Sequence, residues 1–419
     1  MDRTTIPQYT DFDTLADPFE LDRAPLIPEA LLRQHACFIP GDTRYRAAAR
    51  LRQNLLRQDL GLEPGLHRPG GTSTAPVAPL GSMLTPADAA RGLNFISPEV
   101  HAFTRRSLTL REEGACVNVD RLFRNMLSSE PLVRNAFVPL ALELGLATRV
   151  FSQLLPAFVH RVIGIRFETA PSRDREDLRY LGDRSAHDIA LTVITPDGEP
   201  ATLFVEMKYT EACQGPPARH RARYDEASRE AALHRDPDAP ALRSVMLEQF
   251  WRLHLLAELA VRHGHTSRAH LLVLYPRLNR HVRTATRLYA TELKAPEAER
   301  TGFSALTLET FVAALHAAGA EPQARYLHHR YLNLTQVLDL VLGEAAPAAH
   351  VTPVLALATP AAASSSPEAQ SSPALASRPR ISRKRTTGSA AGAPSRPAVD
   401  QAAPVTRQDV SARVRLRRQ

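Results

Sequence analysis

The stretch LFVEMKYT, residues 203–210, decides the fold of this chain. Its apolar residues predict a buried strand, yet Glu206 and Lys208 interrupt the apolar run. Since side chains two residues apart share one face of a strand, we expect this carboxylate and this ammonium to lie side by side. Only three of the 52 Lys and Arg residues are lysines, so a lysine at this place is informative in itself.

An antiparallel hairpin is predicted to hold this strand. In HDIALTVITPDGEPATLFVEMKYT, residues 187–210, two apolar runs flank Asp197-Gly198, which is a strong turn signal. Pairing across that turn brings Asp188 beside Glu206 and Lys208 at one end of the sheet. Carboxylate oxygens are suitable ligands for magnesium. A bound cation can polarise a phosphate and activate a water molecule. A lysine can hold that water or stabilise the negative charge that develops on the phosphate. The set is suited to metal-assisted phosphodiester hydrolysis.

The elements around the hairpin predict an α/β fold with a small mixed sheet flanked by helices. Strands are expected before and after the hairpin, and a long apolar helix is expected between the hairpin and the last strand: 160–169, 268–276 and 242–264. Further helices are predicted over 42–65, 97–114, 119–129, 135–156, 307–319 and 322–343. The core order is helix, three strands, helix, strand.

Composition divides the 419 residues into three predicted parts. Residues 1–90 form an N-terminal extension with a short helix and a Pro/Gly-rich linker, and 91–343 form the α/β domain. Residues 344–419 form an Ala/Pro/Ser/Arg-rich tail that is predicted to be disordered. From Ala345 the tail holds eleven basic and three acidic residues, so it carries the whole net charge of +8, and 1–344 is formally neutral.

The remaining composition predicts a protein of the reducing cytoplasm. Three scattered cysteines indicate neither a disulfide framework nor a C-x-x-C zinc site. The acidic, polar N-terminus is unlike a signal peptide, and no apolar run approaches the ~18 residues of a membrane span. We therefore expect no membrane partner.

Asp188, seventeen intervening residues and then Glu206-Met207-Lys208 resemble the motif of the PD-(D/E)XK nuclease superfamily, whose core has the same element order. The resemblance covers about residues 90–340 and is nearest to a restriction-endonuclease-like prokaryotic branch, marked by YLGDRSAHD, EMKYTE, LEQFWRLHLLAE and LLVLYP. It implies that Asp188, Glu206 and the Met207 carbonyl bind Mg²⁺, with Mn²⁺ as a substitute. Lys208 would activate or position the water. The naming proline is absent, since His187 precedes Asp188, a position that varies in the superfamily.

Three further residues enter as candidates for this site. The superfamily often adds an upstream acid, for which Glu168 is preferred over Glu143. Gln249 stands where relatives carry a glutamine on the following helix. Arg252, three residues on and on the same helix face, is expected to touch phosphate.

The predicted function is a magnesium-dependent nuclease that hydrolyses phosphodiester bonds in DNA. Double-stranded DNA is the expected partner, the basic tail is expected to add salt-sensitive non-specific contacts, and a homodimer is compatible with cutting both strands. One alternative is a catalytically inactive nucleic-acid-binding or scaffold protein that retains the fold, although a complete Asp188, Glu206, Lys208 set argues against it. Another is the same chemistry on RNA or on repair intermediates. Target sequence and endo- or exonuclease action are left open.

Overall fold

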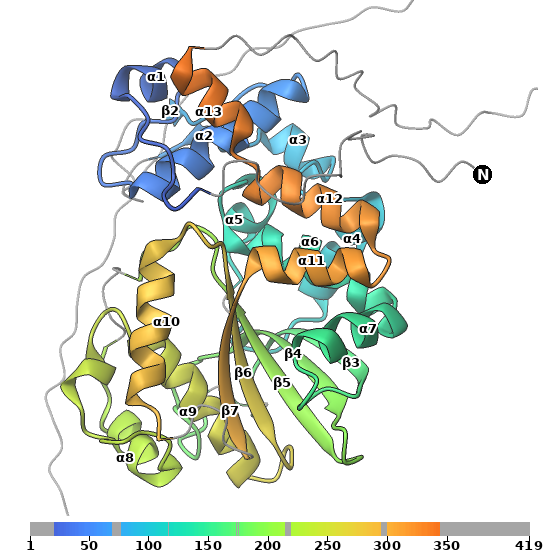
Figure 1. The fold of residues 1–419 in the computed structure, drawn as a ribbon, viewed down its shortest axis with the longest axis vertical. Coiled ribbons are helices and arrows are strands. Elements are labelled where there is room, and N and C mark those ends of the chain that lie inside the picture. Colours follow the sequence, from blue (N-terminus) through green and yellow to red (C-terminus); the bar gives the residue numbers. More distant parts are fainter. Residues whose placement is uncertain are drawn as a thin grey trace, which may run out of the picture. The chain divides into compact units, whose positions relative to one another are not determined.

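The sheet that carries the hairpin has five strands and mixed direction (Figure 1). A computed structural model describes residues 21–68, 77–115, 117–172, 174, 176–213, 219–294 and 300–343. The strands lie in chain order: β3 Arg161–Thr169, β4 His187–Ile194, β5 Pro200–Met207, β6 Ala269–Tyr275 and β7 Thr301–Thr307. The pairs β3–β4 and β4–β5 are antiparallel, whereas β5–β6 and β6–β7 are parallel. The predicted α/β class is confirmed.

The predicted hairpin is present with the expected turn. Ile194 pairs with Pro200, and Ile189 pairs with Val205 at the other end. Gly198 has φ +87°, a left-handed conformation that glycine adopts without strain, so Asp197-Gly198 forms the turn as the sequence indicates. With this register, Asp188 stands opposite Glu206.

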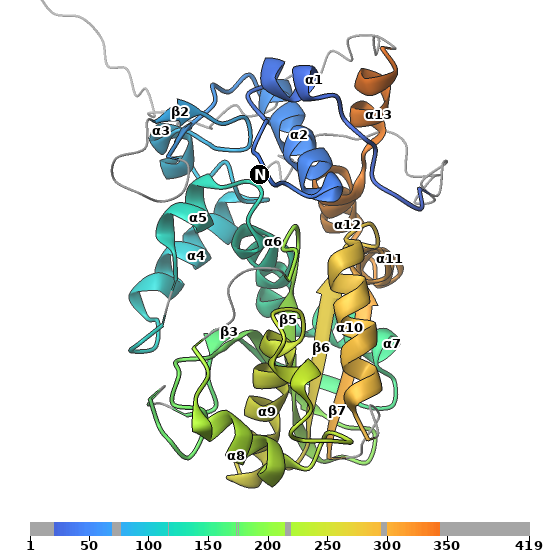
Figure 2. The same ribbon diagram turned by 90° about the vertical axis from the view of Figure 1, so that its left-hand side faces the viewer.

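Helices cover both faces of the sheet (Figures 1 and 2). On one face lie α6 Ser129–Leu142, α7 Leu144–Leu154, α11 Leu308–Ala317 and α12 Glu321–Leu327. On the other lie α8 Ala222–Ala231, α9 Glu248–Arg262 and α10 Arg280–Glu292. Alternate residues of β5 serve the two faces, since Val205 and Met207 join the first cluster and Phe204 joins the second.

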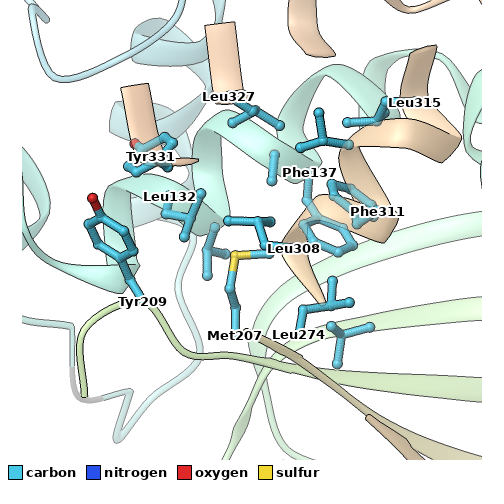
Figure 3. Packing of buried hydrophobic residues seen from close by; sticks show 14 of the residues in the cluster. Leu132, Phe137, Met207, Tyr209, Leu274, Leu308, Phe311, Leu315, Leu327 and Tyr331 are labelled. Atoms are coloured by element: carbon cyan, nitrogen blue, oxygen red, sulfur yellow. The ribbon is translucent and has the colours of Figure 1, made fainter. Parts of the chain in front are cut away.

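The first hydrophobic cluster joins distant parts of the chain (Figure 3). Met207 and Leu274 of the sheet pack beneath Phe137 of α6 and Phe311 of α11, whose rings stack 5.5 Å apart. Helix α2, Arg44–Asp59, contributes Leu51 to the same cluster. Residues on both sides of the predicted boundary at residue 90 therefore share one core.

The remaining described elements complete the fold, and some add buried residues to the core, such as Leu32, Tyr331 and Val337. They are α1 Glu29–Gln34, β1 Leu66–His67, β2 Ala78–Pro79, α3 Pro86–Ala90, α4 Pro98–Thr109, α5 Val119–Arg124, a 3-10 turn Pro240–Arg243, a π-helical turn His328–Leu332 and α13 Thr335–Leu342. The predicted tail, 344–419, lies outside the described residues. Among the described residues, no single helix combines the length and apolar character of a membrane crossing; only the bent pair α6–α7 does so, taken together.

Two expected helices differ from the structure. The helix expected over 135–156 is two helices that meet at Glu143 with a 115° bend, where Pro139 and Gly145 weaken a continuous helix. The closing helix 322–343 is likewise interrupted by the π-helical turn. Strand β7 and helices α8 and α10 were not anticipated.

Candidate active site

The hairpin brings Asp188, Glu206 and Lys208 together at one end of the sheet. The backbone N–H of Met207 donates to Oδ2 of Asp188 at 2.8 Å, which ties the start of β4 to the end of β5. Lys208 directly follows β5, and its own N–H continues the ladder to the carbonyl of Leu274 in β6. The backbone pairing that sets the sheet thus also sets the spacing of these side chains.

Helix α9 adds Gln249 to this group. Nζ of Lys208 lies 2.5 Å from Oε1 of Glu206 and donates to Oε1 of Gln249 at 2.9 Å. Nε2 of Gln249 in turn donates to the same Glu206 oxygen at 3.0 Å. Glu206 and Lys208 are only 4% and 6% exposed, so the triangle of contacts is held away from bulk water.

Burial and mutual repulsion perturb the two carboxyl groups. Burial raises the pKa of Asp188 well above its ordinary value, and the charge of Glu206 raises it further. Burial also raises the pKa of Glu206, against the opposing effect of Lys208. Burial by itself would lower the pKa of Lys208, but Glu206, Glu211 and Asp188 raise it above its usual range, so Lys208 is an ammonium.

These residues line an open cavity of about 330 Å³. One wall is the end of β5 with Gln249, and the opposite wall comes from α5 and the first turns of α6. The lining also contains Arg121, Ser129, Glu130, Arg134, Glu168 and Glu211. The cavity therefore joins a predominantly acidic floor to basic side chains, an arrangement suited to a cation and a phosphate together.

A family model described as the PD-(D/E)XK nuclease superfamily matches residues 40–333, from α2 through the sheet to the π-helical turn. The chain belongs to the PD-(D/E)XK nuclease superfamily. Membership implies nuclease activity, hence a nucleic-acid substrate, and nucleases of this superfamily generally use divalent metal ions. Searches of curated proteins and of solved structures found no significant match.

The donor set at this candidate site fits a hard divalent cation. Asp188 and Glu206 both line the cavity, and their pKa values are raised first by burial and then by neighbouring carboxylates, whose negative charge a cation would neutralise. The described residues contain no group of three or more His, Cys, Asp or Glu side chains arranged as a metal cage. Two carboxylates suffice for Mg²⁺, which usually keeps several waters.

The two candidates for an upstream acid lie in different places. Glu168 lines the candidate active-site cavity at the end of β3 and has the unusual φ of +48° for a residue other than glycine. Glu143 lies at the α6–α7 junction, with its side chain 62% exposed and 3.4 Å from Arg149. Only Glu168 of this pair is near Asp188.

Arg252 does not line the candidate active-site cavity, contrary to the expectation from its place on α9. Its guanidinium contacts Asp183 at 2.8 Å and also pairs with Glu248. Arg252 lies three residues after Gln249, on the same face of α9, but its guanidinium pairs with Asp183 in the loop before β4. Arg252 thus holds the segment that leads into Asp188.

Arg134 is a cavity residue that the sequence reasoning missed. Its side chain is nearly buried, at 6% exposure, and its Cζ lies 4.5 Å from the centre of the Phe167 ring. Within the described part of the chain, Nη1 of Arg134 has no hydrogen-bond partner. Burial lowers the pKa of Arg134 to about 10, although Glu168, Asp188 and Glu130 oppose this shift. A charged residue inside the apolar stretch LVRNAFV was the available signal.

Two more cavity acids were missed, Glu130 on α6 and Glu211 just after Lys208. Glu211 accepts hydrogen bonds from Oγ of Ser129 at 2.8 Å and from the backbone N–H of Tyr209 at 2.6 Å. Burial raises the pKa of Glu130 to about 7, while Arg121, 3.7 Å away, opposes that shift. Glu211 stood in the quoted EMKYTE segment, whereas nothing local to Glu130 indicated its proximity to the hairpin.

Proposed function

We propose that this protein is a magnesium-dependent nuclease that hydrolyses phosphodiester bonds in DNA in the cytoplasm, with Mn²⁺ as an alternative ion. The single observation that carries the proposal is the meeting of Asp188, Glu206 and Lys208 in one open cavity. DNA is favoured over RNA on the resemblance to the restriction-endonuclease-like branch. A duplex has two strands, and the described residues of one chain form one such site, so we propose two copies for double-strand cutting.

Asp188, Glu206 and the carbonyl of Met207 would hold the ion. A divalent ion at this place supplies a polarised phosphate and a more acidic water. Lys208, fixed between Glu206 and Gln249, presents an ammonium to the same cavity. We assign it the task of orienting the attacking water or stabilising negative charge on the phosphate.

Gln249 and Arg134 would support the reaction from opposite walls. Gln249 holds the Lys208 ammonium in place through its carbonyl and so acts as a positioning residue. Arg134 lines the cavity with a guanidinium whose Nη1 has no hydrogen-bond partner among the described residues, and a guanidinium is a fork that matches two phosphate oxygens. We assign it a contact to the phosphate that is cut.

The competing function is a binding protein that retains the fold without catalysis. The intact ammonium–carboxylate–amide arrangement favours catalysis, since binding alone does not require a lysine buried against Glu206. Removing any one of these groups would abolish hydrolysis while leaving a basic wall for nucleic acid.

Cleavage of supercoiled plasmid tests the proposal. The full chain should nick or linearise plasmid with Mg²⁺, and EDTA or Lys208→Ala should abolish this. Lys294→Ala, an exposed lysine just after α10, is the matched control and should cut like the unaltered chain. A chain that shifts plasmid in a gel yet never cuts it with Mg²⁺ or Mn²⁺ would favour the binding protein. Cutting of an RNA but not of plasmid would overturn DNA as the substrate.

A further inference from the structure

A second hollow, of about 170 Å³, lies between the starts of α2 and α10. We call it the basic groove; Arg23, Arg44, Tyr45, Arg280 and His281 line it. The described residues that line it include no Asp or Glu. In a chain whose residues 1–344 are formally neutral, this gathering of arginines is a local excess of positive charge.

The three arginines of the basic groove differ from their neighbours in having no carboxylate partner. Arg46 and Arg50, on the same helix as Arg44, both pair with Asp42, at 3.1 and 2.7 Å. Across the described residues, Arg23, Arg44 and Arg280 form no ion pair, and all three are exposed. Their charges are therefore available to an anion from outside.

The backbone adds to this positive potential. Helix α2 and helix α10 both begin at the groove with an arginine, and neither has an acidic residue in its first turn. A cation at a helix N-terminus is unfavourable because the macrodipole is positive there, and an anion would relieve both helices at once. Tyr45, 7% exposed, lines the same groove, and no described residue is a hydrogen-bond partner of its hydroxyl.

The basic groove is joined to the candidate active site through one segment. Asn279, the N-cap of α10, donates from Nδ2 to the carbonyls of Tyr209 and Glu211, at 3.0 and 2.9 Å. The ring of Tyr45 meets that of Tyr209 edge to face at 6.4 Å. The groove and the active-site cavity thus flank residues 209–211, which directly follow Lys208.

We propose that the basic groove binds a backbone phosphate of the nucleic-acid substrate, on one side of the bond that is cut. This inference rests on the proposed function, because it takes the substrate of the neighbouring site as its ligand. The groove contributes charge and helix N-termini but no base-reading pattern, so it anchors the strand independently of sequence.

Binding of a fluorescent DNA duplex to the full chain, measured by anisotropy with Ca²⁺ in place of Mg²⁺ over a salt series, tests the inference. Arg44→Gln and Arg280→Gln should each weaken binding on the order of 5-fold at low salt and lower the salt slope by about 1. The double variant should lower the slope by about 2. Arg287→Gln, an exposed arginine on α10 that does not line the groove, is the matched control and should bind like the unaltered chain.

The outcomes separate this inference from the proposed function. A double variant with unaltered affinity and salt slope overturns the groove even if plasmid cleavage proceeds. A chain that never cuts, but whose binding depends on Arg44 and Arg280, overturns the nuclease and retains the groove. A last experiment adds inorganic phosphate and measures the melting temperature. If phosphate raises the melting temperature of the unaltered chain but not of the Arg44 and Arg280 variants, while all of them bind the duplex equally, the groove binds free phosphate and the proposal is wrong.

Discussion

At the scale of single residues, Arg134 offers the sharpest test of the active-site cavity. Its charge faces Glu168, Asp188 and Glu130, and Nη1 is unsatisfied within the described residues. Arg134→Lys keeps the charge but loses the planar fork. If the fork contacts the phosphate, the single-turnover cleavage rate should fall on the order of 100-fold with little change in melting temperature.

The control for Arg134 is Arg149→Lys on α7, where the guanidinium is half-exposed and donates to the carbonyl of Ala318. It should cut DNA like the unaltered chain. If Arg134→Lys also does so, then Arg134 serves only to neutralise the surrounding carboxylates. Recovery of the lost rate by added Mg²⁺ would lead to the same conclusion.

Glu130 makes stability depend on pH. Its pKa rises from 4.5 to about 7 on folding, chiefly through burial, so the folded chain holds this proton more tightly than the unfolded chain. The resulting stabilisation is fully present below pH 4.5 and is lost as the pH rises through 7. Glu130→Gln does not titrate and should therefore gain about 1–2 kcal/mol relative to the unaltered chain between pH 5 and pH 8.

Urea denaturation at several pH values, in EDTA, measures this difference for Glu130→Gln. The gap between the two chains should widen toward pH 8. Parallel stability curves would mean that the carboxyl of Glu130 is not desolvated in the fold.

At the scale of elements, the β4–β5 hairpin depends on its turn. Gly198 has φ +87° with open space around its Cα, so Gly198→Ala would strain the backbone without a steric clash. We expect a loss of about 1 kcal/mol in the free energy of unfolding. Gly145→Ala, in the first turn of α7, meets only one atom, at 3.8 Å, and should be neutral or stabilising.

Urea denaturation of the two glycine variants is the measurement. Equal stabilities for Gly198→Ala and Gly145→Ala would show that the turn does not require a left-handed residue. If the strained turn also displaces Asp188 from Glu206, Gly198→Ala should cut DNA more slowly as well.

The elements that could be predicted are those with a local signal. Asp197-Gly198 indicated the hairpin. Ser97 followed by Pro98 indicated α4, where the Ser97 side chain accepts a hydrogen bond from the backbone N–H of Val100. Strand β7, with the sequence TGFSALT, has a weak apolar pattern and exists because β6 pairs with it. The break at Glu143 had a local signal in Pro139 and Gly145, but α7 then packs against β3 and α11, contacts that no local pattern contains.

The candidate site divides in the same way. Asp188, Glu206 and Lys208 lie on one hairpin, so period and turn sufficed to bring them together. Arg134 and Glu130 reach the cavity from α6 by tertiary packing. Arg252 instead pairs with Asp183, in the loop before β4. Local sequence periodicity does not predict long-range contacts of this kind.

At the scale of the whole molecule, α2 is part of the core rather than an appendage. Leu51 is fully buried, and Gln53 donates to the Tyr209 hydroxyl at 3.1 Å and to the carbonyl of Arg330 at 2.8 Å. A chain that begins at residue 91 would expose this surface and leave buried polar groups unpaired. We expect it to lose cooperative thermal unfolding.

A chain that ends at residue 343 is the companion variant. It lacks only the segment that the sequence predicts to be disordered, so it should unfold as cooperatively as the full chain. It should also bind DNA with a weaker salt dependence, because the segment carries a net charge of +7. Cooperative unfolding of the chain that begins at residue 91 would instead establish the sequence boundary at residue 90 as a real domain limit.

The hairpin has a consequence for how this protein can change over generations. The groups assigned to the ion and the attacking water occupy one uninterrupted piece of chain, from Asp188 to Lys208, whereas the walls around them come from α5, α6 and α9. Mutations in the walls that spare Arg134 and Gln249 can change what the cavity accepts while the reaction is kept. A recombination event that exchanges the rest of the walls passes on the reactive hairpin whole, so new specificities can arise around the same chemistry.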